Sequence, residues 1–376
     1  MLRCLFAAVT LTVLLVCGEA RAFEVDARAA ILLDYRNDKV LFAKNPDEEL
    51  PPASMSKLMT ALVIFEDLRS GRLALDQELP VSEKAWRMGG SRMFVEVNTR
   101  VKVRDLLRGV IVQSGNDACI VLAEAVSGSE QAFVDRMNAR ARELGLEHSH
   151  FANATGWPAE DHYMSVRDLA TIARIIIEEY PEYYDLYSIR EFEYNGIKQT
   201  NRNPLLRAGV PGVDGMKTGH TSEAGYGLVA SAERDGRRLV LVVAGTTSSN
   251  KRRSEAERLL EYGFRNFHEY RIYDKGQTVV EVPVWQGEDS TVPLIGHDVV
   301  GITLDRAERP GLSAKVRYES PVAAPITAGQ KLGEVEIDLQ GKPAATIPLV
   351  AAIDVPRAGI FGRMTGALDY LIWGRD

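Results

Sequence analysis

The chain has 376 residues, of which 45% are hydrophobic and 26% charged, and its formal charge is −7 at pH 7. This length exceeds that of one typical domain and predicts two or three. The composition is ordinary for a soluble globular protein. The acidic balance argues against a general nucleic-acid-binding protein, which would carry a basic surface.

The first 22 residues have the pattern of a secretory signal peptide. Arg3 precedes an apolar run from Leu5 to Val16, and Ala20-Arg21-Ala22 supplies small residues at the two positions that a signal peptidase reads. We therefore expect cleavage after Ala22 and export of the mature chain. A lipoprotein attached through Cys17 fits less well, because Val16 stands where a small residue is expected.

Signal cleavage would leave Cys119 as the only cysteine, so the mature chain could form no internal disulfide. Cys119 lies in an apolar run over residues 118–125. This setting favours a small buried side chain over a catalytic thiol.

Short β-type runs begin the mature chain. Residues 29–35 and 40–44 flank Arg36-Asn37-Asp38-Lys39, a pattern that predicts a hairpin. Apolar residues then recur at helical spacing over residues 54–69, with Pro51-Pro52 before them and Gly71 after them. This spacing predicts a helix.

Ser54 and Lys57 stand three residues apart at the start of this predicted helix, so their side chains share one face. A serine hydroxyl is a poor nucleophile until an adjacent base takes its proton. Lys57 can be that base only if burial or a nearby cation lowers its pKa. In isolation, such a pair is more typical of an N-cap serine and a solvated lysine.

A second polar motif follows further along the chain. Residues 79–98 predict a loop with short strands, and residues 103–112 are apolar and periodic. They lead to Ser114-Gly115-Asn116, where Gly115 would permit a tight turn that aims a hydroxyl and a carboxamide into one space. Two helices are expected after it, over residues 130–144 and 165–179.

The third motif, Lys217-Thr218-Gly219, precedes two β-type runs at residues 225–233 and 238–245 with a turn between them. A lysine and a threonine hydroxyl on a strand can hold a carboxylate, and the glycine lets a ligand approach the backbone. Residues 254–267 predict a helix that packs back on the same sheet.

The pattern changes near Lys275, where short β-type runs alternate with Gly, Pro and Asp. This change predicts a small all-β domain. We therefore divide the chain into a signal peptide (1–22), a catalytic domain (23–274), an all-β domain (275–354) and a C-terminal segment (355–376).

Residues 356–376 are amphipathic at helical spacing. Ile360, Met364 and Leu368 fall on one side of the helix and Asp369 on the other. The segment is too short and too polar for a transmembrane span. We expect a helix that lies in the membrane interface, and a helix docked on the protein is the alternative.

Together, the three motifs carry a resemblance that none of them carries alone. Ser54-Met55-Ser56-Lys57, Ser114-Gly115-Asn116 and Lys217-Thr218-Gly219, about 60 and 100 residues apart, resemble the active site of penicillin-binding proteins and serine β-lactamases. With Asn201-Arg202-Asn203 and Asp214-Gly215-Met216, the whole mature chain is similar to the low-molecular-mass D-alanyl-D-alanine carboxypeptidases of the penicillin-binding protein 5 and 6 family.

This resemblance implies an α/β (α+β) domain, with a mixed and mainly antiparallel sheet covered by helices. A β-sandwich-like domain and an amphipathic anchor helix would follow. It further implies a substrate, the peptidoglycan stem peptide that ends in D-Ala-D-Ala, and β-lactam antibiotics as covalent inhibitors. The location implied is the periplasmic face of the bacterial inner membrane.

The family also implies roles for individual residues. Ser54 would attack the carbonyl between the last two D-alanines, Lys57 would be the general base, and Ser114 would relay a proton to the departing D-alanine. Asn116 would hydrogen-bond the substrate and position Lys57. The backbone N–H groups of Ser54 and His220 would form the oxyanion hole.

The terminal carboxylate would be held by the third motif, Lys217-Thr218-Gly219, and Lys217 would also keep Lys57 from ionising fully. Arg202 matches a family arginine near the carboxylate. Arg252 matches a second one, and its neighbour Arg253 makes that alignment ambiguous. No metal-ligand cluster or phosphate-binding loop is visible in the sequence, so we predict no cofactor.

The chain departs from the family pattern at one point. Where the closest members have a histidine before a glycine, this chain has Thr155-Gly156. A role for that histidine in deacylation is therefore not carried over, while the three motifs are intact.

Three alternatives share some of these features. A class A β-lactamase would need a glutamate and an asparagine placed to activate water, and residues 156–165 offer only Glu160 and Asp161 in an unrelated pattern. A D,D-endopeptidase cuts the same kind of bond in cross-linked peptides. A catalytically silent cell-wall-binding protein would not need all three motifs complete.

Overall fold

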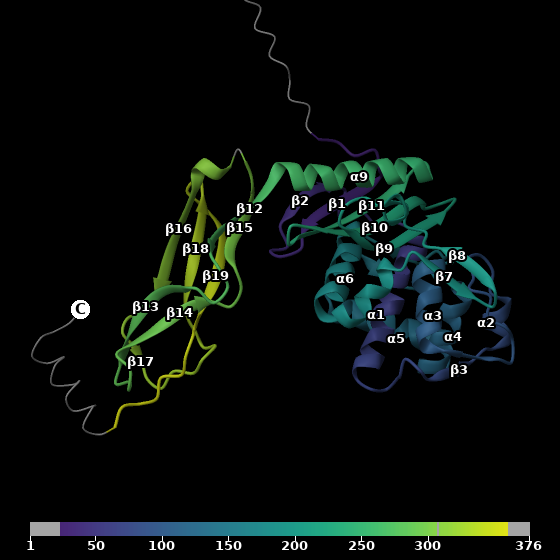
Figure 1. Cartoon of the computed structure of the whole chain (residues 1–376). Coiled ribbons are helices and arrows are strands. Elements are labelled where there is room, and N and C mark those ends of the chain that lie inside the picture. The colour runs from purple at the N-terminus through teal and green to yellow at the C-terminus, as the bar shows by residue number, and fades with distance from the viewer. Residues whose placement is uncertain (1–22, 307, 360–376) are drawn as a thin grey trace, which may run out of the picture.

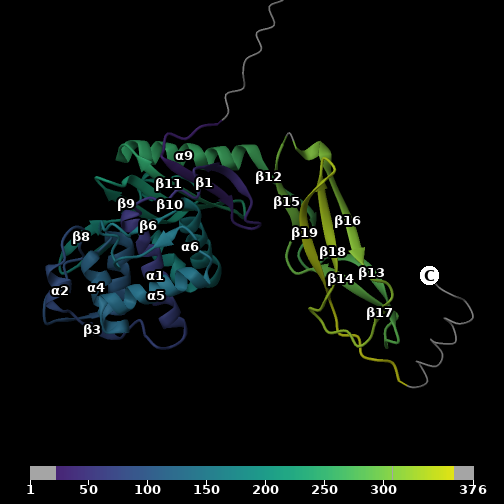
Figure 2. The same ribbon diagram turned by 180° about the vertical axis from the view of Figure 1, so that it is seen from behind.

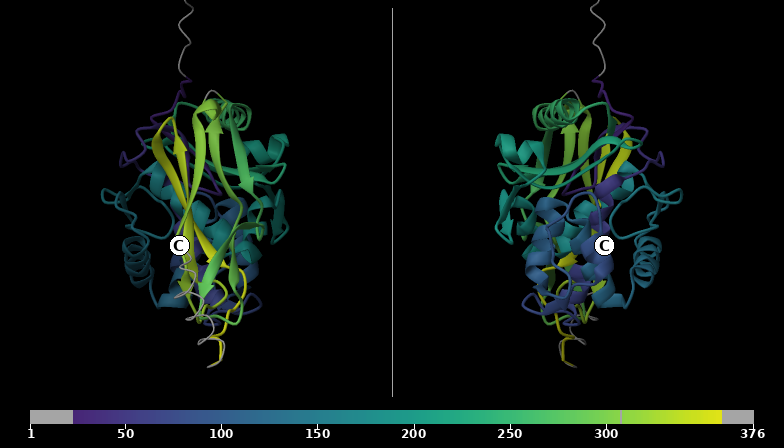
Figure 3. Two further views of the ribbon diagram at one scale, coloured as in Figure 1. Left: turned by 90° about the vertical axis from the view of Figure 1, so that its left-hand side faces the viewer. Right: turned by 90° about the vertical axis from the view of Figure 1, so that its right-hand side faces the viewer.

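The computed structural model describes residues 23–306 and 308–359. The predicted signal peptide lies outside these residues, and so does the predicted C-terminal helix beyond Gly359. The described chain forms two domains that lie side by side (Figures 1 and 2). Viewed along the line that joins them, the two domains overlap (Figure 3).

The first domain contains helices and short helical turns that surround one sheet. They are η1 (Ala53–Ser56), α1 (Lys57–Arg69), α2 (Glu83–Arg87), α3 (Val103–Arg108), the π-helical turn η2 (Gly109–Gln113), α4 (Asn116–Ser127), α5 (Glu130–Glu143), α6 (Val166–Glu179), α7 (Pro181–Tyr184), η3 (Asp185–Ser188), α8 (Pro204–Ala208) and α9 (Ser249–Asn266).

The main sheet of this domain has five antiparallel strands in the order β2-β1-β11-β10-β9. Three small two-stranded sheets accompany it, β3-β4, β5-β6 and β7-β8. The strands of the domain are β1 (Ala29–Asp34), β2 (Val40–Lys44), β3 (Glu78–Pro80), β4 (Arg100–Lys102), β5 (Ser149–His150), β6 (Tyr163–Met164), β7 (Glu191–Tyr194), β8 (Ile197–Thr200), β9 (Val213–Thr221), β10 (Gly225–Arg234) and β11 (Arg237–Thr246).

Helices cover both faces of the main sheet, which is why β1 is buried along its whole length. Ile31 and Leu33 belong to the larger core with α1 and α6, whereas Ala30 and Leu32 belong to the core under α9. This alternation is the two-residue period of a strand. Figure 1 shows α9 on one side of the sheet and α1, α3, α4, α5 and α6 on the opposite side.

Helix α1 passes through the larger core and is buried at nearly every position, so it has no polar face. The turn η1, which leads into it, lies against β9, the edge strand, whose one partner among the described strands is β10. The open edge of β9 and the start of α1 therefore face each other. This arrangement brings the first and third sequence motifs together.

Several elements lie within one residue of their predicted bounds, among them β1, β10, β11, α5 and α6. Others differ. The predicted first helix starts with the 3-10 turn η1, so Ser54 lies in that turn and α1 begins at Lys57. Helix α9 begins at residue 249 instead of 254, because Ser248 caps it by accepting from Lys251 N–H. The predicted loop at 79–98 contains α2, capped by Ser82.

The second domain is built from β-strands, which confirms the predicted β-rich unit. Its main sheet has the order β16-β18-β19-β14-β13-β17, and β12 pairs with β15. The strands are β12 (Phe267–Tyr273), β13 (Thr278–Trp285), β14 (Thr291–Gly296), β15 (Val300–Asp305), β16 (Leu312–Tyr318), β17 (Val322–Ala323), β18 (Lys331–Leu339) and β19 (Lys342–Ala351), with the 3-10 turn η4 (Arg309–Gly311).

Both predicted limits of this domain need correction. Strand β12 begins directly after α9 and pairs with β15, so the β domain starts at Phe267, earlier than the predicted residue 275. At the other end, Val355 bridges Ile326 and Arg357 bridges Gly287. The predicted C-terminal helix therefore does not begin at residue 356.

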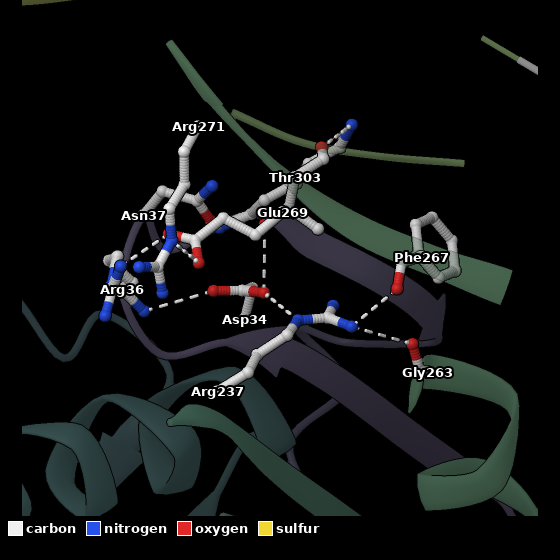
Figure 4. Close-up of polar contacts among 10 residues, drawn as sticks. Asp34, Arg36, Asn37, Arg237, Gly263, Phe267, Glu269, Arg271 and Thr303 are labelled. Carbon is white, nitrogen blue, oxygen red and sulfur yellow. Dashed lines mark hydrogen bonds and ion pairs between the residues drawn. The ribbon is translucent and has the colours of Figure 1, made fainter. Parts of the chain in front are cut away.

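A network of charged and polar groups joins the two domains (Figure 4). The carboxylate of Asp34, at the end of β1, accepts hydrogen bonds from Arg237 Nε at 2.9 Å and from Thr303 Oγ1 of β15 at 3.0 Å. Arg237 also donates to the backbone carbonyl of Phe267 at 2.6 Å. Arg36 pairs with Glu269 of β12 at 2.5 Å. The hairpin β1–β2 is thus held directly against β12 and β15.

Candidate active site

A cavity of about 580 Å³ opens where the edge strand β9 faces η1. Its lining contains hydroxyl, amide and cationic side chains and no carboxylate. The residues that line it are Ser54, Ser91, Ser114, Lys198, Gln199, Thr200, Arg202, Arg207, Thr218, Gly219, His220, Tyr226 and Arg252. Of the residues predicted for the site, only Lys57, Asn116 and Lys217 lie behind this wall, and all three are buried.

Ser54 enters the cavity from η1, and Lys57 lies directly behind it. Lys57 Nζ is 2.9 Å from Ser54 Oγ and 2.8 Å from Asn116 Oδ1, and it also donates to the backbone carbonyl of Thr155. Ala53, just before the serine, has a φ of +48°, which is unusual for a residue with a side chain. This bend turns the chain into η1 and places the hydroxyl beside the amine.

Burial lowers the pKa of Lys57 from 10.5 to about 8, because desolvation disfavours the ammonium form. The positive charge of Arg202 lowers the pKa further, while Asp117 opposes it. About half of Lys57 is therefore neutral near pH 8. A neutral amine at hydrogen-bond distance from a hydroxyl can accept its proton.

The second motif follows the π-helical turn η2, which places Ser114 in the left-handed region with a φ of +62°. The sequence analysis assigned the tight turn to Gly115, but Gly115 has a negative φ and serves close packing instead. A Cβ at Gly115 would lie 2.9 Å from Asp117 Oδ1 and 3.2 Å from Met93 N. Ser114 therefore takes the strained conformation that turns its hydroxyl into the cavity.

Asn116 and Asp117 fix the wall beside the second motif. The Asn116 amide accepts from Lys57 through Oδ1 and donates to the Gly89 carbonyl through Nδ2 at 2.9 Å. Because both ends of the amide are engaged, its orientation is set. The Asp117 carboxylate accepts from the backbone N–H groups of Met93 and Phe94, at 3.0 and 2.8 Å.

The third motif lies on β9 across the cavity. Lys217 Nζ donates to Ser114 Oγ at 2.8 Å and to its neighbour's carbonyl, Thr218 O, at 3.1 Å. Burial lowers the pKa of Lys217 well below its usual value, and the charge of Lys57 lowers it further. Within the described residues, neither Lys57 nor Lys217 forms an ion pair with a carboxylate. Two buried lysines therefore lie in one site, Lys57 bonded to Ser54 and Asn116 and Lys217 bonded to Ser114.

The predicted arginines, Arg202 and Arg252, both line the cavity. Arg202 Nε donates to the Gln113 carbonyl at 3.2 Å, just before Ser114. Arg252 is 8% exposed and lies over the Tyr226 ring at 5.6 Å, whereas Arg253 pairs with Glu257 outside the cavity. The geometry thus separates the two arginines that the sequence left ambiguous.

Sequence reasoning missed the residues that complete the wall. Lys198, Gln199 and Thr200 come from the hairpin β7–β8, which was not predicted, and Gln199 Nε2 holds that hairpin on the Arg92 carbonyl at 2.9 Å. Tyr226 stacks on His220 with ring centroids 3.9 Å apart. The sequence Tyr194-Asn195-Gly196 does contain a hairpin signal in Asn-Gly.

Cys119 is fully buried behind the site, as expected from its apolar surroundings, and burial raises the pKa of its thiol to about 11. The thiol is therefore unreactive near neutral pH. Among residues 23–306 and 308–359, no group of three His, Cys, Asp or Glu side chains could hold a metal ion. None of the helices described here is long and apolar enough to cross a membrane.

A nucleophilic serine beside a buried lysine, opposite a lysine and a threonine on an edge strand, defines a serine enzyme of the S-x-x-K class. Residues 17–248 match the family described as D-alanyl-D-alanine carboxypeptidase (Peptidase S11), and residues 267–357 match the penicillin-binding protein 5 C-terminal domain. The chain therefore belongs to the Peptidase S11 family of D-alanyl-D-alanine carboxypeptidases.

Relatives of known name and structure agree with this assignment. The chain is 40% identical over 347 residues to the D-alanyl-D-alanine carboxypeptidase DacC of Escherichia coli, which covers 90% of this chain and 87% of the relative. It is 37% identical over 355 residues to DacA of the same organism, covering 93% of this chain and 87% of the relative. The crystal structure of penicillin-binding protein 5 from Haemophilus influenzae matches with a TM-score of 0.81 and 38% identity, over 89% of this chain and 99% of that one.

Proposed function

We propose that this chain is a serine-type D-Ala-D-Ala carboxypeptidase that removes the terminal D-alanine from peptidoglycan stem peptides. The observation that carries the proposal is the contact between Ser54 Oγ and a buried amine, Lys57 Nζ, at 2.9 Å. Burial lowers the pKa of that amine to about 8. Such a base makes a serine hydroxyl nucleophilic without a histidine.

In the first step Ser54 Oγ attacks the carbonyl carbon between the two D-alanines, and Lys57 Nζ accepts the hydroxyl proton. The developing oxyanion is stabilised by the backbone N–H groups of Ser54 and His220, a contribution of about 3 kcal/mol for each such donor. The position of His220 on the edge strand β9, where it lines the same cavity as Ser54, supports this assignment.

In the second step the peptide C–N bond breaks and the departing D-alanine nitrogen takes a proton through Ser114. The hydrogen bond that Lys217 donates to Ser114 supports this route. Lys217, Thr218 and Arg202 hold the terminal carboxylate, and Arg252 adds positive charge further along the cavity. No carboxylate lines this cavity to compete with the substrate.

Water then releases the shortened peptide from the Ser54 ester, with Lys57 again taking a proton. Thr155 occupies the position of the family histidine, but only its backbone carbonyl contacts the site, where it accepts from Lys57. Deacylation here therefore uses the lysine. A β-lactam acylates the same serine and keeps its amine attached, so we expect a long-lived penicillin adduct.

The cavity gives no support to a class A β-lactamase. Glu160 and Asp161, the two carboxylates of the loop after Gly156, are both exposed and do not line the cavity. A D,D-endopeptidase is the second candidate, because a relative of that name, the D-alanyl-D-alanine endopeptidase of Escherichia coli, is 30% identical over 243 residues. The match covers 63% of this chain and 76% of that relative.

We further propose that the protein is exported and attached to the outer face of the inner membrane by its C-terminal segment. The last described residues lie at the end of the β domain remote from β8, a strand of the cavity wall (Figure 1). Attachment there would leave the cavity facing the wall. Flotation of the full mature chain with anionic vesicles, compared with a chain that ends at residue 359, tests this attachment.

The test of the activity is release of D-alanine from diacetyl-L-lysyl-D-alanyl-D-alanine by the purified mature chain. Ser54→Ala should abolish release and penicillin labelling. Ser70→Ala, at the other end of helix α1, is the matched control and should keep both. Penicillin labelling without release would favour the endopeptidase, and neither labelling nor release would favour a silent cell-wall-binding protein.

A further inference from the structure

The active-site cavity holds more positive charge than one substrate carboxylate requires. Arg207 lines it together with Arg202 and Arg252, and no described residue of its wall carries a carboxylate. In the proposed function, the terminal carboxylate of the substrate is held by Lys217, Thr218 and Arg202. Arg207 and Arg252 are therefore available to a second anionic group.

The position of Arg207 is set by the helix that carries it. Arg207 lies in the last turn of α8, which packs against both β9 and α9. Asn203 caps the other end of α8, and its Nδ2 donates to the Gly215 carbonyl at 2.7 Å. Gly215 belongs to β9 and stands two residues before Lys217. The helix is thus fixed on the strand that carries the third motif.

The guanidinium of Arg207 is exposed and unpaired. Within the part of the chain that the structure describes, it forms no ion pair and donates no hydrogen bond. Lys198 lines the same cavity but differs in this respect, because it pairs with Glu191 at 2.6 Å. Arg207 is therefore a cation of the cavity wall whose charge no described protein group neutralises.

Arg252 is the buried neighbour of this cation. Its guanidinium donates to Ser249 Oγ at 3.3 Å, and its Nε is buried with no hydrogen-bond partner among the described residues. Burial lowers the pKa of Arg252, and the charge of Arg207 lowers it further, although Tyr226 opposes this effect. The two guanidiniums are thus close enough to repel each other. An anion bound to both would offset the repulsion and satisfy the buried N–H group.

Two aromatic rings connect Arg252 to the strand that holds the terminal carboxylate. Arg252 lies over the Tyr226 ring at 5.6 Å, and Tyr226 stacks on His220 with ring centroids 3.9 Å apart. His220 directly follows the third motif on β9. The departing residue is held at this motif by its own carboxylate. Its side chain is therefore the part of the substrate that can extend towards Arg252 and Arg207.

We propose that Arg207 is a specificity-determining residue that binds, together with Arg252, a second carboxylate on the side chain of the departing residue. This inference rests on the proposed function. The substrate class is a peptide whose C-terminal D-amino acid is acidic, and the methyl group of a terminal D-alanine leaves this position unused. A guanidinium can hold a carboxylate through two parallel N–H···O bonds, whereas a neutral amide of the same shape gains less.

The test uses peptides in which diacetyl-L-lysyl-D-alanine is followed by D-glutamate or by D-glutamine. These two departing residues have nearly the same size and differ in charge. The wild type should cleave the D-glutamyl peptide with a kcat/KM about tenfold above that for the D-glutaminyl peptide. Arg207→Gln should reduce this ratio to about twofold, and Arg207→Lys, which keeps the charge, should retain most of it. The wild-type ratio should also fall in 1 M salt, because ions screen an exposed charge.

Arg142→Gln is the matched control, because Arg142 is an exposed arginine in the last turn of α5 and does not line the cavity. It should keep the wild-type ratio. Penicillin labelling checks that each variant has a folded active site. A wild-type ratio near one, an unchanged ratio in Arg207→Gln, or no cleavage of either peptide would overturn the proposal. Failure of the wild type to release D-alanine from diacetyl-L-lysyl-D-alanyl-D-alanine would instead overturn the proposed function.

Discussion

The active-site cavity and the domain junction both bury charged side chains, but only the junction pairs them with opposite charges. Lys57 and Lys217 are 1% and 2% exposed, and their hydrogen bonds go to hydroxyl, amide and carbonyl oxygens. Asp34 is also 2% exposed, and it lies 2.9 Å from the guanidinium of Arg237 (Figure 4). Burial thus leaves the two lysines without an opposite charge, whereas it leaves Asp34 paired with Arg237.

The presence or absence of a paired charge indicates different roles for the cavity and the junction. An unpaired buried amine costs stability while charged, and that cost lowers its pKa until the neutral, basic form is available. A buried carboxylate with a cation and a hydroxyl around it is satisfied, and it connects β1 to β15, while its partner Arg237 holds the end of α9 and the start of β12. Substitutions in the cavity should therefore change chemistry, whereas substitutions at the junction should change stability.

The largest effect is expected from removing the buried base. Lys57→Met keeps an unbranched side chain of similar length but offers no proton acceptor, so D-alanine release and penicillin acylation should fall about 10⁴-fold. Lys39→Met is the matched control, because Lys39 donates from the junction to the Thr303 carbonyl at 2.8 Å. The control should keep the wild-type second-order acylation rate. Lys57→Met with activity within tenfold of wild type would refute the assigned base.

The next largest effect is expected from breaking the buried pair at the junction. Asp34→Ala leaves Arg237 without its carboxylate and Thr303 without its acceptor, and should lower the free energy of unfolding by about 3–5 kcal/mol. Urea denaturation followed by circular dichroism measures this change. Well below the melting temperature, kcat/KM should match the wild type.

Asp76→Ala removes an exposed partner of Arg104 in the same domain and serves as the control. It should cost less than about 1 kcal/mol. One contrary result is that Asp34→Ala lowers the free energy of unfolding no more than Asp76→Ala does, and another is that it lowers kcat/KM in the folded protein. Either result would contradict the claim that the junction serves stability and the cavity serves chemistry.

Part of the catalytic site could be predicted from sequence because its motifs are local. Ser54 and Lys57 share a face of one helical turn whatever the tertiary structure, and Asn116 follows Ser114 by two residues. The spacing does not show that β9 lies opposite η1. Only the resemblance brought Lys217 into the same site. The contact of Lys57 with the Thr155 carbonyl is made by backbone, so no residue type could have indicated it.

The domain boundary was missed for a different physical reason. Helix α9 passes into β12 between Asn266 and Phe267 with no glycine or proline to separate them, so no turn signal marks the change. The apolar residues of β12 also continue a pattern that fits either structure over a short stretch. Pairing with β15, about 30 residues later, is what makes the segment a strand.

A smaller effect is expected from pH. Because burial lowers the pKa of Lys57 to about 8, the neutral base is scarce at pH 6 and half populated near pH 8. The second-order rate of penicillin acylation should therefore rise about 50-fold from pH 6 to pH 8 and level off above that. Arg202→Gln removes a charge that lowers this pKa and should move the midpoint to higher pH. A rate independent of pH over this range would contradict a titrating lysine base.

The smallest effect is expected from a substitution at the exposed edge of the junction, which can be compared with the substitution of the buried Asp34. Arg36 pairs with Glu269 at 2.5 Å, but the arginine side chain is 40% exposed and Glu269 has a second partner in Arg271. Arg36→Ala should lower the free energy of unfolding by less than about 1 kcal/mol, and less still in 1 M salt, because water and ions screen exposed pairs. Urea denaturation at low and high salt measures both values. A loss as large as that of Asp34→Ala and insensitive to salt would mean that the exposed pair, and not the buried carboxylate, holds the domains together.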